Sequence, residues 1–104
     1  MSATSATADV AAVRQTEDGF ALTGPVTIST AVNIIDAARV SWPETGDSVV
    51  DFAGVTEADS AALALIFKWQ RDAARRERKI RCINIPANVA ALARLYGVDE
   101  LIPA

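Results

Sequence analysis

Three carboxylates that could do chemistry, Asp51, Glu57 and Asp59, lie close together in the sequence at and beyond the end of an apolar run. In α/β proteins, functional sites often lie at the carboxyl ends of strands. The three side chains could hold a hard cation such as Mg²⁺, or Asp51 could accept a phosphoryl group. However, no acidic pair ends the first predicted strand, as such a phosphoacceptor site would need. We therefore interpret Asp51 and Glu57 as solvated loop carboxylates.

The side chains that most often catalyse reactions are scarce in this chain. It has 104 residues with no His and a single cysteine, Cys82. Without His, the Ser–His–Asp and Cys–His triads are excluded and the commonest metal ligand is missing. One cysteine excludes an internal disulfide, and neither a G-x-G-x-x-G motif nor a phosphate-binding loop ending in Lys-Ser or Lys-Thr occurs. We predict no catalytic residues, no cofactor and no metal.

The basic residues gather in one part of the chain. Seven of the ten Lys and Arg lie between Lys68 and Arg81, whereas the whole chain has a net charge of −3. Because a nucleic-acid-binding surface would be basic more widely, the composition argues against that function. Two interpretations stay open. The cluster is either a solvated helix end, favoured by the helix dipole, or a docking surface for an acidic partner or anionic lipid headgroups.

The step from Asp59 to Ser60 is the most informative local feature. A residue of this type before a long periodic segment is an N-cap, worth about 1 kcal/mol. At 100° per residue, the hydroxyl of Ser60 lies on a stripe away from the apolar face. We predict that this stripe, with Asp59 and the small Ala61 beside it, binds a partner. The further members of the stripe are Ala64, Phe67, Lys68 and Arg71. For Phe67, partner surface and core rim are equally good interpretations.

Hydrophobic periodicity and turn chemistry predict the strands and helices that position the Asp59–Ser60 pair. We predict strands at 9–14, 20–26, 48–52 and 80–85, and helices from Ser29 or Thr30 to about Trp42, over 59–78 and over 89–96. The order β-β-α-β-α-β-α predicts an α/β fold in which helices pack on a mixed four-stranded sheet. We expect one domain over 9–104 after a flexible tail at 1–8, with the C-terminal tail packed back onto it.

Individual positions refine this prediction. Pro25 cannot donate to a ladder, so its strand should end or lie at an edge there. The buried face of the first helix should carry Val32, Ile35 and Ala38. In the long second helix, the apolar positions face the sheet at helical spacing. The core should therefore contain Leu63, Ile66, Trp69 and Val50.

Residues 49–65 resemble the signature of STAS domains, the sulfate-transporter and anti-sigma-factor-antagonist family, in which an Asp-Ser or Asp-Thr step opens the second helix. Residues 87–101 are similar to the C-terminus of one branch, the small cytoplasmic subunits of Mla lipid-asymmetry ABC transporters. The resemblance covers almost the whole chain and implies the STAS fold.

The resemblance also implies a function. It indicates a non-enzymatic subunit that binds the ATPase of the transporter, and through it the permease, in the cytoplasm at the inner membrane of a Gram-negative bacterium. The alternative is an anti-sigma factor antagonist switched by phosphorylation of Ser60. Ala61 and Ala62 stand where those antagonists commonly carry a small polar residue and Gly. No apolar run approaches the roughly 20 residues that span a bilayer, and the N-terminus lacks the pattern of a signal peptide.

Overall fold

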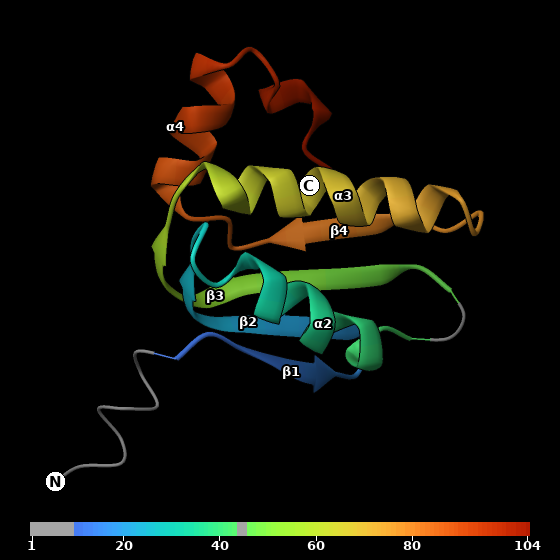
Figure 1. Cartoon of the computed structure of the whole chain (residues 1–104). Coiled ribbons are helices and arrows are strands. Elements are labelled where there is room, and N and C mark those ends of the chain that lie inside the picture. The colour runs from blue at the N-terminus through green and yellow to red at the C-terminus, as the bar shows by residue number, and fades with distance from the viewer. Residues whose placement is uncertain (1–9, 44–45) are drawn as a thin grey trace, which may run out of the picture.

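Strands and helices alternate along the chain in the computed structural model, which describes residues 10–43 and 46–104 (Figure 1). The strands are β1 (Ala12–Thr16), β2 (Gly19–Val26), β3 (Ser48–Ala58) and β4 (Ile80–Ile83). The helices are α2 (Ala31–Ser41), α3 (Ser60–Ala74) and α4 (Ala87–Leu95), followed by the short 3-10 helix η1 (Asp99–Leu101). This is the predicted element order. The predicted tail at 1–8 lies outside the described residues.

The four strands form one mixed sheet in the order β1-β2-β3-β4. β1 pairs antiparallel with β2, whereas β2 with β3 and β3 with β4 are parallel. Figure 1 shows α2 and α3 side by side on the same face of this sheet, with α4 beyond the end of β4. The predicted α/β fold, a mixed four-stranded sheet with helices packed on it, is therefore confirmed.

The core lies between this helical layer and the sheet. Val50 and Ile66 are fully buried, and Leu63 and Trp69 are at most 4% exposed. All four predicted core residues are thus confirmed. Their partners from the sheet and from α2 are Phe20, Leu22, Val26, Phe52, Cys82, Ile34 and Ala38.

The strand β3 is much longer than the predicted 48–52, and that prediction is wrong at its C-terminal end. Parallel pairing with β2 continues to Ala58, through two register irregularities on either side of Gly24. A sheet partner can hold a stretch extended although its own sequence contains a glycine such as Gly54. Asp51 and Glu57, which we interpreted as loop carboxylates, both lie in β3, although the predicted strand contained only Asp51.

The predicted buried face of α2 is partly wrong. Ile34 and Ala38, four positions apart, face the core, whereas Val32 is 69% exposed and Ile35 is half-buried. Thr30 precedes the helix as predicted, but its hydroxyl donates to the carbonyl of Pro25 at 2.9 Å and makes no cap hydrogen bond. The contacts of α2 with β1 and β2, and not the helix pattern alone, therefore fix its rotation.

The backbone groups at the two edges of the sheet are accommodated in different ways. The pairing of β1 ends opposite Thr23, so Pro25 has no neighbour on that side and its missing N–H leaves no gap in the ladder. At the other edge, the backbone N–H of Cys82 donates to the carbonyl of Pro103 at 2.6 Å. The C-terminal tail thus packs back onto the domain, as predicted.

Candidate functional site

Asp59 connects the start of α3 to the segment before α2. Its backbone is extended, and its Oδ1 accepts a hydrogen bond from the backbone N–H of Ala61 at 2.8 Å, which caps the helix. Its Oδ2 accepts from the backbone N–H of Ile28 at 3.2 Å. The predicted cap is therefore present, and the same carboxylate also holds Ile28 beside the first turn of α3.

The predicted stripe on α3 divides by exposure. Ser60, Ala64 and Arg71 are exposed, and Lys68 is half-buried. Ala61 is only 8% exposed, so the expectation that it projects away from the core is wrong. The reason is helical spacing, because Ala61 lies four residues before the buried Leu65 and therefore shares its face.

Phe67 lies at the border of this stripe. It is half-buried and packs against the core cluster, which agrees with the core-rim interpretation. An aromatic ring held in this way gives the stripe a fixed apolar edge next to Ala64 and Lys68. We use the term "α3 docking face" for the surface where we predict that a partner binds. It consists of Ile28, which Asp59 holds, the exposed Val32 in the first turn of α2, and Asp59, Ser60, Ala64, Phe67, Lys68 and Arg71.

Ile28 and Val32 are the residues of this face that the sequence reasoning missed. They are 76% and 69% exposed, among the large apolar side chains that the structure leaves in solvent. Helical periodicity predicts Val32 on the buried face of its helix, and Ile28 lies in a connection with no periodic signal. The rotation of α2 on the sheet, which buries Ile34 and Ala38, turns Val32 toward solvent.

The charges on α3 are partly compensated. Asp72 accepts hydrogen bonds from Lys68 Nζ at 3.1 Å and from Arg75 Nη1 at 3.3 Å. Arg78 Nη1 donates to the carbonyl of Pro43 at 2.7 Å and so ties the end of α3 to the segment after α2. The predicted basic cluster is therefore not a uniformly free positive surface, because Lys68, Arg75 and Arg78 make contacts within the domain.

The carboxylate of Asp51 also has a structural role. Its Oδ1 accepts from the backbone N–H of Ala53 at 2.9 Å and from Asn84 Nδ2 at 3.0 Å, which links β3 to the segment after β4. Within the described residues, no group of three or more Cys, Asp or Glu is arranged to hold a metal ion. Burial raises the pKa of the Cys82 thiol to about 12, so the thiol is protonated at neutral pH.

The mixed sheet, with α2 and α3 on one face and an Asp-Ser step opening α3, defines a STAS-type α/β domain. A family model described as the MlaB-type STAS domain matches residues 10–103. The chain belongs to this family. A search among curated proteins finds no match to it. None of the helices in the described residues is long and apolar enough to cross a membrane.

Proposed function

We propose that this chain is a non-enzymatic accessory subunit that binds the cytoplasmic ATPase of an Mla-type phospholipid ABC transporter. It supports the assembly and activity of the transporter in maintaining the lipid asymmetry of the outer membrane. The membership in the MlaB-type STAS family supports this class of partner. The subunit is cytoplasmic and reaches the inner membrane and the permease only through the ATPase.

The observation that carries the proposal is the composition of the α3 docking face. The side chains of Ser60 and Ala64 are small and exposed, so the backbone of a partner can approach α3 closely. Ile28, which Asp59 holds beside the first turn of α3, and Val32, in the first turn of α2, expose most of their apolar surface. Apolar side chains next to small ones, with Lys68 and Arg71 further along, match the apolar centre and polar rim of a protein interface.

The electrostatics of this face suit a partner with acidic groups at the rim of the contact. Arg71 is exposed, and Lys68 keeps a half-buried ammonium group beside Asp72. Rim charges of this kind change the rate of association and its salt dependence more than the affinity. We therefore expect the apolar and small residues to determine binding, and Lys68 and Arg71 to tune it.

The test is co-purification of tagged variants with the ATPase and permease from the native cell. Ser60→Glu and Ala64→Arg place charge or bulk in the proposed contact, and each should abolish recovery of the ATPase. Ser60→Glu should leave the melting temperature nearly unchanged, because a carboxylate near a helix N-terminus interacts favourably with the helix dipole.

Matched controls come from α4, whose first residue, Ala87, is exposed like Ser60, and whose Ala91 is exposed like Ala64. Ala87→Glu and Ala91→Arg introduce the same groups into another helix and should bind the ATPase as the parent does. If Ser60→Glu and Ala64→Arg remain folded and still recover the ATPase, the docking face lies elsewhere.

The same pull-down separates the proposal from the anti-sigma factor antagonist interpretation. That alternative requires a partner kinase and a phosphate on Ser60, whose position at an exposed helix start leaves its hydroxyl accessible. Recovery of a sigma-regulating kinase in place of an ABC ATPase, with Ser60 phosphorylated in the recovered chain, would contradict the transporter proposal.

A further inference from the structure

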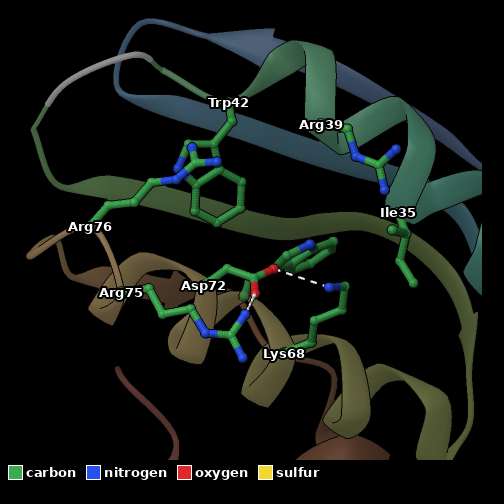
Figure 2. Close-up of a pocket in the computed structure, with 8 residues that line it drawn as sticks. Ile35, Arg39, Trp42, Lys68, Asp72, Arg75 and Arg76 are labelled. Carbon is green, nitrogen blue, oxygen red and sulfur yellow. Dashed lines mark hydrogen bonds and ion pairs between the residues drawn. The ribbon is translucent and has the colours of Figure 1, made fainter.

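A hollow of about 230 Å³ lies between α2 and α3, on the helical side of the molecule. We call it the α2–α3 cleft. Figure 2 shows that Arg39 and Trp42 enter it from α2 and the segment that follows, while Lys68, Asp72, Arg75 and Arg76 come from α3 and its C-terminal end. Side chains far apart in the sequence thus converge on one concave surface.

The cleft has more positive than negative charge. Its lining contains four cationic side chains and a single carboxylate, that of Asp72, which Lys68 and Arg75 share at 3.1 and 3.3 Å. Arg39 pairs with Asp36 at 3.8 Å, but both side chains are more than 60% exposed and this pair is weak. Within the described ranges, 10–43 and 46–104, no ion pair involves Arg76. The cations of the cleft therefore repel one another, and a bound anion would relieve this repulsion.

The floor of the cleft is aromatic and firmly held. Trp42 and Trp69 both contact Phe20, with ring centroids 5.2 and 5.1 Å apart, and Trp69 is only 3% exposed. The hydrogen bond from Arg78 to the carbonyl of Pro43 fixes the segment that carries Trp42. An apolar floor keeps water away from one side of the cleft, which strengthens the attraction between the cations above it and an anion.

We propose that the α2–α3 cleft is a binding site for a phosphate monoester group. The planar guanidinium groups of Arg39 and Arg76 match phosphate oxygens with two parallel hydrogen bonds each, and they belong to opposite sides of the cleft. The hollow is smaller than the roughly 300–1,000 Å³ of sites for larger organic ligands, so it suits a phosphate with a short substituent. The same chemistry occurs on a soluble phosphate monoester and on the headgroup of phosphatidic acid.

This inference goes beyond the proposed binding of the ATPase and does not depend on it. Of the cleft residues named above, only Lys68 also belongs to the α3 docking face. Variants of Arg39 and Arg76 therefore test the cleft, while Ser60→Glu and Ala64→Arg test the docking face. A failure of one proposal leaves the other standing.

Tryptophan fluorescence can detect binding at this site, because the two tryptophans of the chain, Trp42 and Trp69, both line the cleft. The experiment follows tryptophan emission of the full chain at fixed ionic strength during titration with inorganic phosphate, glycerol 3-phosphate, or phosphatidylcholine vesicles with and without phosphatidic acid. We expect a saturable change. A change with glycerol 3-phosphate identifies a soluble ligand, and a change only with vesicles containing phosphatidic acid identifies a lipid headgroup.

Two charge-neutralising variants test the assignment to Arg39 and Arg76. Arg39→Gln and Arg76→Gln should each weaken the apparent affinity about tenfold, as expected for the loss of one charge-assisted contact. Arg94→Gln is the matched control, because it removes the same charge from an exposed position on α4 and should bind like the parent. The proposal is overturned if no probe gives a saturable change, or if Arg94→Gln loses as much affinity as the cleft variants.

Discussion

The carboxylate of Asp59 accepts a hydrogen bond at 3.2 Å from the backbone N–H of Ile28, which lies 31 positions earlier in the sequence. The other oxygen of the same carboxylate caps α3 through the N–H of Ala61 at 2.8 Å. One side chain therefore stabilises a helix start and also fixes the connection between β2 and α2 against it. The exposed Ile28 consequently stands beside the first turn of α3, where we propose that the ATPase binds.

The two functions of Asp59 can be separated by substitution. Asp59→Ala removes both hydrogen bonds and should lower the free energy of unfolding by about 1–3 kcal/mol, since the cap alone is worth about 1 kcal/mol. In Asp59→Ser the hydroxyl can still cap the helix but cannot accept from both partners. This variant should therefore lose less stability than Asp59→Ala. Reversible urea unfolding measures both. Equal loss in the two variants would contradict the contribution of the cap.

The packing of α3 on the sheet predicts a large effect at Ile66. Its side chain is fully buried, so Ile66→Ala should lower the free energy of unfolding by roughly 2–5 kcal/mol through lost burial and a residual cavity. Val40→Ala is the control, because Val40 is 84% exposed and its truncation should change stability by less than about 0.5 kcal/mol. Denaturant unfolding in which the two variants behave alike would contradict the observed rotation of α3.

Two glycines with positive φ should differ in their tolerance of alanine. At Gly24 (φ 79°), a Cβ would clash with the carbonyl oxygen of Val10, whereas at Gly97 (φ 71°) nothing lies within 4 Å of the added Cβ. Gly97→Ala should cost about 1–2 kcal/mol, the penalty for the left-handed conformation. Gly24→Ala bears that penalty and a backbone clash and should cost clearly more. Thermal or urea unfolding of the two variants makes the comparison, and equal losses would contradict the close approach at Gly24.

The buried thiol of Cys82 makes stability depend on pH in the alkaline range. Burial raises its pKa from 9.0 to about 12, so between these values the unfolded chain loses a proton that the folded chain keeps. Below pH 9 this contribution to stability is fully present, and it falls as the pH rises toward 12, by at most about 1.4 kcal/mol per pH unit. Urea unfolding between pH 8 and about 10.5 measures the free energy of unfolding of the parent and of Cys82→Ala. This free energy should fall more steeply with pH in the parent than in Cys82→Ala. Parallel curves would mean that the thiol is not buried.

Much of α3 could be predicted because its information is local. A capping residue at Asp59 and apolar side chains three or four positions apart identify both the helix start and its buried face, and Leu63, Ile66 and Trp69 lie where this periodicity places them. The family signature, residues 49–65, is a continuous stretch that runs through β3 into the start of α3. The fold class followed because alternating strands and helices leave few ways of burying one apolar face of each element.

The features that the sequence could not predict all depend on partners far along the chain. β3 runs on to Ala58 because β2 pairs with it, through two register irregularities, as far as Val26. α2 buries Ile34 rather than Val32 because of its contacts with the sheet. The same holds for the two surfaces that we propose to be functional. Ile28 meets Asp59, and Arg39 and Arg76 come to line the same α2–α3 cleft, only after the sheet has brought their elements together. Periodicity records how a residue relates to neighbours within a turn or two, whereas these contacts are decided by strand register and helix packing, which act between segments that are remote in the sequence.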